Sequence, residues 1–292
     1  MRRFELLEPR SVGEACRFLS EYGEGAKLLA GGTALVKLIK KRLIDPSYLV
    51  DLKGIRELAY IRWEEEGLRI GALTTLSEIE GSSVVRGQMG VLGEMVHGIG
   101  SVQIRNVGTL VGNLCFGDPA SDAAPLLMVL GASLKVASLG GVREIPLEGF
   151  FKDFYETGLG EGEVVEEIGI PVLPERTGVV YLRHSVRAGF DPAVVGVGVV
   201  ITIGGQDGRC EEARVVLGGV RATPFRVEGV EESLRGRVVG ESLIRKVVEG
   251  ALEGLEVMQD VRASADYRRQ MVRLYVERGI GVAMERAKGG RA

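Results

Sequence analysis

The stretch GSVQIRNVGTLVGNLCFGDPASD, residues 100–122, mixes glycine, small polar and apolar residues in a way that an ordinary surface loop does not require. Glycine lets a backbone approach a ligand closely and adopt positive φ, while Thr, Asn and Asp side chains bond turns or ligand hydroxyls. The same stretch also contains four apolar residues between the polar ones: Val107, Leu110, Val111 and Leu114. The pattern predicts a half-buried loop around a polar ligand, with a tight-turn region in a β-rich core as an equal alternative.

A second stretch, KLLAGGTALVKLIKK at residues 27–41, favours the ligand interpretation. Its apolar residues 28–30 predict a buried strand, its Gly-Gly-Thr triplet a turn, and the apolar spacing over 34–41 a helix. A strand, a glycine turn and a helix start gather backbone N–H groups that can hold an anion. The spacing matches neither GxGxxG nor GxxxxGK[S/T], so a Rossmann fingerprint and a P-loop are excluded.

These motifs together resemble the FAD-binding subunit of the molybdenum hydroxylases, a family that includes the medium subunit of aerobic CO dehydrogenase and the flavin subunit of xanthine dehydrogenases. The resemblance covers essentially the whole chain in order. It implies an α+β protein with the FAD-binding PCMH-type fold of the vanillyl-alcohol-oxidase group and a C-terminal α+β domain. The matching segments are AGGT at 30–33, QIRNxGTxxGN at 103–113, ASD at 120–122, VLGGVRATPFR at 216–226 and DVRASADYRRQM at 260–271.

The resemblance also implies which residues contact FAD. Backbone N–H groups of the Gly-Gly-Thr triplet, and those of Gly112 and Asn113, would bind the pyrophosphate. Asp122 would hold a ribityl or ribose hydroxyl, and it could also cap the helix that follows it. The implied cofactor-binding residues are Leu29, Ala30, Gly31, Gly32, Thr33, Leu35, Ile99, Gly108, Thr109, Val111, Gly112, Asn113 and Asp122.

Four other residues of the matching segments or close to them are not included in this set. Ala34 stands where many relatives carry Asp or Glu, at a position where the backbone does the binding. Val194 falls where animal xanthine dehydrogenases have a cofactor-contacting Lys, which leaves the electron acceptor open because groups near the flavin ring tune its potential. Gln103 and Arg105 are left outside the site, since they can order the loop without touching the flavin.

Side chains suited to catalysis or metal binding are scarce. His97 and His184 are the only histidines, and neither has the neighbours of a hydrolase triad or a metal site. Three cysteines without a Cys-x-x-Cys pair exclude a disulfide framework and a self-contained zinc or iron–sulfur site. We therefore expect no catalytic residue and no metal site in this chain.

The resemblance assigns the remaining redox groups to partners. Molybdopterin would sit on a large subunit and two [2Fe–2S] clusters on a small subunit, and the FAD would pass their electrons to NAD or another acceptor. One alternative is a standalone FAD oxidase of the same fold, which would need its own substrate base. Another is a non-catalytic nucleotide-binding protein that kept the glycine stretches.

Composition sets the outer limits. The chain has 292 residues, a net charge of −3 and 45% hydrophobic residues, so we expect a soluble protein without a nucleic-acid or anionic-membrane partner. No apolar stretch has membrane-spanning length, and Arg2 and Arg3 lead into a capped helix rather than an apolar segment. We expect a cytoplasmic protein with three units, at 1–56, 57–175 and 176–292.

Local signals predict further elements. SVGE at 11–14 and TLSE at 75–78 have the pattern of capping boxes. Residues 58–61 and 68–71 are expected to form a hairpin around an acidic turn. The last helix, from residue 265 to 284, is expected to bury a stripe formed by Tyr267, Met271, Leu274 and Tyr275.

The scarcity of reactive side chains near the glycine stretches generates a first prediction. FAD should be held without a covalent bond, because backbone N–H groups and hydroxyls bind it and no suitably placed His or Cys can form a link. Acid or heat precipitation should release intact FAD into the supernatant, where its absorbance measures it. Flavin that stays with the precipitated protein would contradict this.

Overall fold

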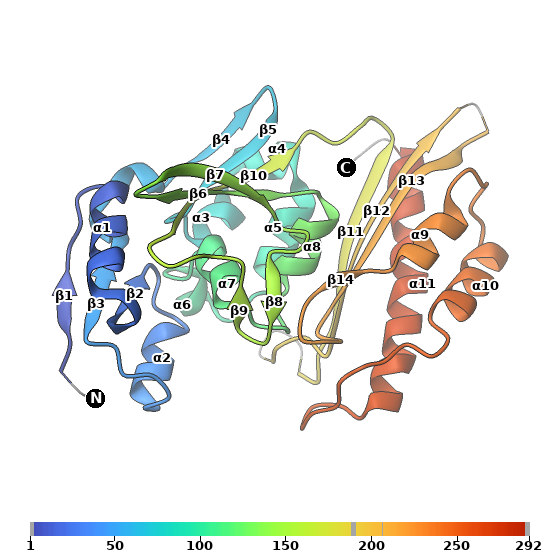
Figure 1. Cartoon of the computed structure of the whole chain (residues 1–292). Coiled ribbons are helices and arrows are strands. Elements are labelled where there is room, and N and C mark those ends of the chain that lie inside the picture. The colour runs from blue at the N-terminus through green and yellow to red at the C-terminus, as the bar shows by residue number, and fades with distance from the viewer. Residues whose placement is uncertain (1–2, 188–190, 206, 290–292) are drawn as a thin grey trace.

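The computed structural model describes residues 3–187, 191–205 and 207–289. Three multi-stranded sheets lie side by side in the order of the sequence, and the long helix α11 packs at the C-terminal end of the molecule (Figure 1). Over the described ranges no helix combines the length and apolarity that a membrane crossing requires.

The N-terminal sheet is parallel because helices connect its strands. Its order is β1 (Glu5–Leu7), β3 (Tyr48–Asp51) and β2 (Ala26–Leu29), with both pairings parallel. Helix α1 (Val12–Tyr22) follows β1, and α2 (Leu35–Lys40) follows β2, as predicted. Short 3₁₀ turns lie at Gly23–Gly25, Leu52–Gly54 and Arg56–Leu58.

The two predicted capping boxes differ in outcome. Thr75 forms a complete box with Glu78, since the Thr75 hydroxyl accepts from Glu78 N at 3.2 Å and the Glu78 carboxylate accepts from Thr75 N at 2.7 Å. Ser11 caps α1 at Glu14 N, but the Glu14 carboxylate accepts from Arg10 N at 2.8 Å rather than from Ser11 N. The box predicted at Ser11 is therefore only half correct.

The middle sheet is antiparallel, and helices fill the space beside it. Buried Leu68 and Ile70 belong to one core with Leu126 and Leu127. The strand order is β4 (Ile61–Glu64), β5 (Gly67–Gly71), β10 (Val164–Pro171), β6 (Ser133–Ser138) and β7 (Gly141–Pro146). The helices are α3 (Leu76–Gly81), α4 (Ser83–Gln88), α5 (Gly90–His97) and α8 (Ala123–Val129), and the small hairpin β8 (Phe151–Asp153) and β9 (Glu156–Thr157) follows β7.

The predicted hairpin exists, but its first strand begins three residues later than expected, at Ile61. Leu58 instead ends a 3₁₀ turn, is buried, and accepts a hydrogen bond from Leu73 N at 2.8 Å through its carbonyl. Its burial therefore comes from a turn against the next segment rather than from a strand. The spacing of apolar residues alone does not distinguish a buried strand from a buried 3₁₀ turn.

Residues 100–122 contain two short helices where a loop is predicted. Helix α6 (Val102–Arg105) begins after Ser101 and α7 (Leu110–Phe116) after Thr109, and each hydroxyl caps its own helix. Gly112 lies inside α7, and Gly117 ends it in the left-handed conformation. The loop interpretation of this stretch is therefore wrong, because the two hydroxyl caps start helices that the glycines do not prevent.

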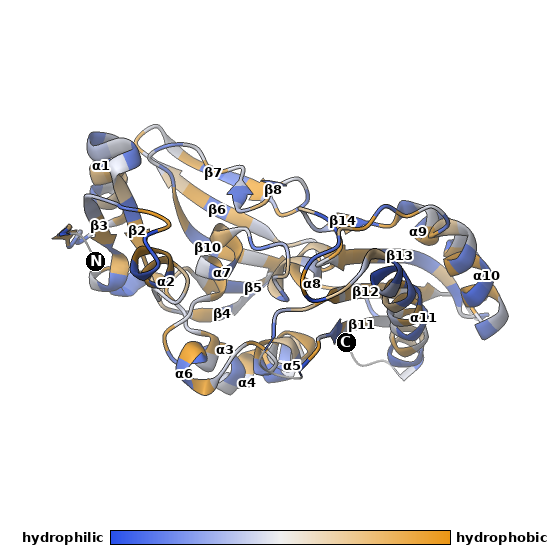
Figure 2. Cartoon of the chain, turned by 90° about the horizontal axis from the view of Figure 1, so that it is seen from below, coloured by the Kyte–Doolittle hydropathy of each residue, from blue (hydrophilic) through white to orange (hydrophobic). Residues whose placement is uncertain are grey.

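The C-terminal sheet is antiparallel, and α11 covers one of its faces. Its strand β12 is buried and apolar along nearly its whole length (Figure 2). Gly178 allows α11 to pack closely against β11, since a Cβ at position 178 would overlap the Ala283 carbonyl oxygen. The elements are β11 (Thr177–His184), β12 (Val195–Gly204), β13 (Arg209–Gly218), β14 (Phe225–Arg226), α9 (Glu228–Leu234), α10 (Glu241–Ala251) and α11 (Ala265–Gly289).

The apolar cores do not stop at the predicted unit boundaries. Ala137 and Val164, from the middle unit, pack in the core of the N-terminal unit. Val200 and Val216, from the C-terminal sheet, pack in the core of the middle unit. The division at about residues 56 and 175 stays a prediction.

The buried stripe of α11 is offset by one residue from the predicted one. Its buried positions include Val272, Val276, Ile280 and Ala283. Of the predicted residues, Met271 and Tyr275 are partly buried against the same core, whereas Tyr267 is 41% exposed. The stripe begins with Arg268, a charged residue at a core position, so the search for apolar side chains selected the neighbouring face.

Arg268 is fully buried because hydrogen bonds satisfy its guanidinium group. It donates to Asp260 at 3.1 Å, to the Val194 carbonyl at 3.1 Å and to the Met258 carbonyl. Burial alone would raise the pKa of Asp260, but hydrogen bonds from Arg262 and the two nearby guanidinium charges lower it to about 2. The network fixes the start of α11 against the beginning of β12.

This network generates a pH prediction. Because the folded-state pKa of Asp260 is depressed, its stabilisation is present above about pH 4 and is lost as pH falls toward about 2, by on the order of 2 kcal/mol. Asp260→Asn should lower the free energy of unfolding near neutral pH and weaken its acid dependence, as measured by urea titration. Asp266→Asn, at a carboxylate that is 88% exposed, is the control and should change little. Equal acid dependence in wild type and Asp260→Asn would contradict the assignment.

Candidate functional site

A cavity of about 580 Å³ lies between the N-terminal unit and the middle unit. Both glycine stretches line it, one through residues 30–35 and the other through residues 108–109 and 111–113. Eleven of the thirteen predicted site residues are among its lining residues: Ala30, Gly31, Gly32, Thr33, Leu35, Ile99, Gly108, Thr109, Val111, Gly112 and Asn113. The two outside the lining are Leu29 and Asp122.

The two glycine stretches meet backbone to backbone at Gly31. A Cβ at Gly31 would overlap the Val107 carbonyl oxygen and lie 2.8 Å from Gly108 Cα. A Cβ at Gly108 would in turn lie 2.9 Å from the Ile104 carbonyl oxygen. A side chain at Gly31 would therefore separate the two sides of the cavity.

The turn after β2 presents backbone amides to the cavity. Gly32 has φ +70°, a conformation that favours glycine, and the first helical hydrogen bond runs from Val36 N to Gly32 O at 3.0 Å. The amides of residues 33–35 precede that bond and have no partner within the helix. All three residues line the cavity, so this turn can bind an anionic group.

Two amides in the first turns of α7 have hydrogen-bond partners within the chain. Gly112 N donates to the Thr109 hydroxyl at 3.0 Å, and Asn113 N donates to the Thr109 carbonyl at 3.1 Å. Both amides therefore already have partners inside the chain, and their role as pyrophosphate donors stays a prediction. The amide of Val111 also comes before the first helical bond, and Val111 lines the cavity, whereas Leu110 is fully buried and is not a lining residue.

Asp122 does not cap α8, so that interpretation is wrong. The Ser121 hydroxyl has this role, since it accepts from Ala124 N at 3.2 Å and donates to the Asn113 side-chain oxygen at 2.6 Å. Sequence reasoning missed Ser121, although Ser is as good an N-cap residue as Asp and stands one position before it.

Asp122 is instead the buried partner of two residues on β11. Its carboxylate accepts from the Tyr181 hydroxyl at 2.6 Å and lies 3.3 Å from the Arg183 guanidinium. Burial raises the pKa of Asp122, although the charge of Arg183 and the hydrogen bond from Tyr181 oppose the rise. Arg183 also donates to the Gly98 carbonyl at 2.6 Å, next to Ile99 in the cavity lining. The trio joins the C-terminal sheet to the end of α5.

Arg105 orders the loop beside the cavity, as predicted. It is 7% exposed, and it donates to the Ile99 carbonyl at 3.3 Å, the Gly100 carbonyl at 3.2 Å and Glu80 at 2.8 Å. Gln103 is exposed and is not a lining residue.

The histidines have structural surroundings. His97 lies at the exposed end of α5, 2.6 Å from Glu80, as predicted. His184 lies 2.8 Å from the Tyr267 hydroxyl. Neither is a lining residue of the cavity.

Among the lining residues that were not predicted from the sequence, three have reactive or aromatic side chains at one end of α7 or in the β8–β9 hairpin. Cys115 faces the cavity from α7, and burial raises the pKa of its thiol to about 12. Phe116 and Tyr155 form an aromatic pair with ring centroids 5.1 Å apart. No local motif marks them, because their place depends on how α7 meets the β8–β9 hairpin.

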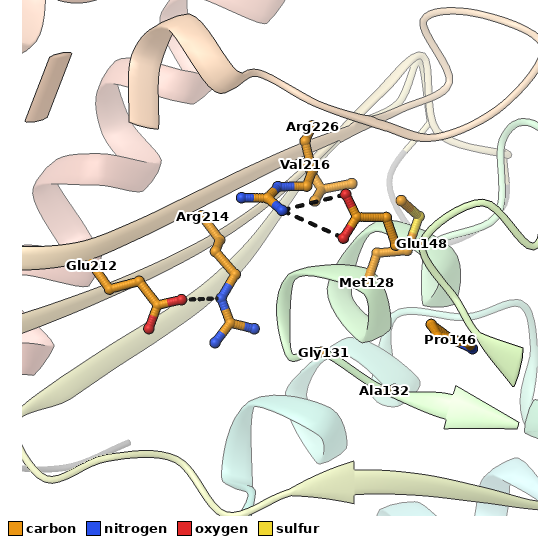
Figure 3. A pocket seen from close by; sticks show the side chains of 9 residues that line it. All are labelled: Met128, Gly131, Ala132, Pro146, Glu148, Glu212, Arg214, Val216 and Arg226. Atoms are coloured by element: carbon orange, nitrogen blue, oxygen red, sulfur yellow. Dashed lines mark hydrogen bonds and ion pairs between the residues drawn. The ribbon is translucent and has the colours of Figure 1, made fainter. Parts of the chain in front are cut away.

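A smaller cavity of about 280 Å³ lies where the turn between α8 and β6 meets β13 and β14 (Figure 3). Each of its arginines already faces carboxylates: Arg214 lies 2.7 Å from Glu212, and Arg226 lies 3.3 Å from Glu148 and 2.6 Å from Glu231. Its positive charge is thus neutralised, and the larger cavity remains the candidate site.

Comparison with known proteins agrees with this geometry. The family described as FAD binding domain in molybdopterin dehydrogenase matches residues 2–173, and the CO dehydrogenase flavoprotein C-terminal domain matches residues 180–282. The chain belongs to the FAD-binding subunits of the molybdenum hydroxylases. The predicted family and α+β fold class are confirmed.

Members of this family align over nearly the whole chain. The chain is 34% identical to the carbon monoxide dehydrogenase medium chain of Hydrogenophaga pseudoflava, over 97% of this chain and 98% of that protein. It is 33% identical to subunit alpha of the 6-hydroxypseudooxynicotine dehydrogenase complex of Paenarthrobacter nicotinovorans, over 98% and 96%. Among solved structures, carbon monoxide dehydrogenase from Hydrogenophaga pseudoflava superposes with a TM-score of 0.93, covering 98% of both chains at 34% identity.

The contact at Gly31 generates a prediction for this family member. Gly31→Ala should fold but lose FAD, because its Cβ overlaps backbone atoms that cannot move without separating the two glycine stretches. The ratio of flavin to protein absorbance measures occupancy. Gly25→Ala is the matched control, since a Cβ there has open space and the residue lies in the same unit. Full occupancy in Gly31→Ala would show that the contact does not shape the site.

Proposed function

We propose that this chain is the electron-transfer subunit of a molybdenum hydroxylase complex and that FAD binds in the cavity between its first two units. The observation that carries this proposal is the meeting of the two glycine stretches at Gly31, which gives one cavity amides from two helix starts. FAD supplies the redox chemistry when bound, since its ring can accept and release electrons.

The lining residues suit the two chemical parts of FAD. Amides of residues 33–35, with that of Val111, are placed for the negatively charged pyrophosphate. Ile99, Val164 and Val165 supply apolar surface for a planar ring. A lining that contains both free amides and apolar side chains supports a dinucleotide over a free phosphate.

Partner subunits complete the proposed electron path. Molybdopterin would lie on a large subunit and two [2Fe–2S] clusters on a small one, and the FAD would pass electrons to NAD or another acceptor. In the described part of the chain, no group of three or more His, Cys, Asp or Glu residues is arranged to hold a metal ion. A cytoplasmic location belongs to the same proposal, in keeping with three unpaired cysteines.

A standalone oxidase is the weaker candidate. It would need a base beside the flavin to activate its own substrate. Both histidines lie outside the cavity lining, and Cys115 is held as a thiol by its raised pKa.

The test separates cluster reduction from acceptor reduction. We expect co-expression with the large and small subunits to give a stable complex that oxidises a substrate from a panel of CO, aldehydes and N-heterocycles, with NAD or a dye as acceptor. The complex with Gly31→Ala should still reduce its clusters with substrate, seen by bleaching of their visible absorbance, but should fail to reduce the acceptor.

The complex with Gly25→Ala serves as the control and should behave as wild type. Substrate turnover by the isolated chain would support the standalone oxidase instead. Normal acceptor reduction by a complex without FAD would show that electrons leave by another route.

A further inference from the structure

The β8–β9 hairpin ends in two aromatic residues that its turn does not favour. Asp153 pairs with Glu156, so Phe154 and Tyr155 form a two-residue loop. Such loops favour Gly, Asn and Asp, because they require positive φ. Phe154 is 53% exposed and Tyr155 is 58% exposed, so packing into the core does not explain two large rings here.

Tyr155 has an unfavourable backbone conformation. Its φ is +58°, and among the described non-glycine residues only Arg42 and Arg176 share a positive φ. A bulky residue in this region is a genuine outlier, and such outliers concentrate at ligand-binding positions. Of the three, Tyr155 alone lines the cavity.

The contacts that fix the turn use the backbone of Tyr155 rather than its ring. Tyr155 N donates to the Gly117 carbonyl at 3.0 Å, and the backbone of Gly117 is so close that a Cβ there would lie 3.2 Å from Tyr155 Cα. Gly or Asn at position 155 would keep both contacts and would tolerate the left-handed conformation. The fold of this turn therefore does not explain why an aromatic side chain occupies position 155.

The surroundings of the Tyr155 ring indicate a role in ligand binding. It packs against Phe116 at the end of α7, and both residues line the same cavity as the glycine stretches. Figure 1 shows β9 beside α7. Together the two side chains form an aromatic surface at the edge of the cavity.

We propose that Tyr155 is a cofactor-positioning residue whose ring stacks against a planar ring of the bound FAD, and that this contact maintains its strained backbone. The inference rests on the proposed function, since it requires FAD in this cavity. FAD carries two planar rings, adenine and isoalloxazine, and the same stacking chemistry applies to both.

The experiment compares FAD affinity with the stability of the protein free of FAD. Tyr155→Asn removes the ring but tolerates positive φ, whereas Tyr155→Phe keeps the ring. Arg176→Asn is the matched control, because it relieves a similar φ of +55° at an exposed residue outside the cavity. Flavin fluorescence gives the dissociation constant, and thermal unfolding of the FAD-free protein gives Tm.

We expect Tyr155→Asn to weaken FAD binding about threefold to tenfold without lowering the Tm of the FAD-free protein. Tyr155→Phe should bind within about twofold of wild type, since stacking needs the ring and not the hydroxyl. Arg176→Asn should bind as wild type does. Titration with FMN and with ADP then identifies the stacked ring. The loss of affinity in Tyr155→Asn should appear only with the fragment that carries the stacked ring, isoalloxazine in FMN or adenine in ADP.

Two results would overturn the assignment: unchanged FAD affinity in Tyr155→Asn, or a clear fall in its Tm without FAD, which would make the ring structural. These results leave the proposed function intact. A wild-type protein that binds no FAD would instead remove the proposed function, before any variant is compared.

Discussion

The close approach of Gly31 to the Val107–Gly108 backbone is the constraint on which the site depends. One side of the cavity follows a parallel strand near the N-terminus, and the other begins α7 in the next unit. Two backbones at this distance leave no room for a Cβ, so neither side can shift without exposing or closing the cavity. The proposed cofactor site is thus defined mainly by the geometry of the main chain.

A second set of contacts links this site to the C-terminal sheet. Asp122 follows the second glycine stretch, and its buried carboxylate faces Tyr181 and Arg183 on β11. Arg183 reaches back to the Gly98 carbonyl beside the cavity. A change in how β11 packs would therefore reach residues 98–99 and the start of α8, although the C-terminal sheet is far from them in sequence.

The sequence predicted the family and eleven of the thirteen proposed site residues that line the cavity, because glycine motifs are local signals. It could not predict β7, whose residues are almost all exposed, so no alternating pattern exists there. The buried face of α11 was misplaced because Arg268 occupies a core position that apolar spacing cannot recognise. Tyr155 and the pairing of Asp122 with β11 depend on contacts between segments distant in sequence. Tertiary structure decides these features, and no single segment contains the information.

The high pKa of Cys115 has a consequence for the chemical durability of the protein. Oxidation of cysteine to sulfenic acid proceeds through the thiolate, whose population at neutral pH is negligible for a thiol with a pKa of about 12. Cys115 is half-buried, whereas Cys16 and Cys210 are fully buried, and burial raises the pKa of their two thiols too. At neutral pH the Cys115 thiol thus stays protonated, and this side chain contributes to the cavity lining as an unreactive apolar group.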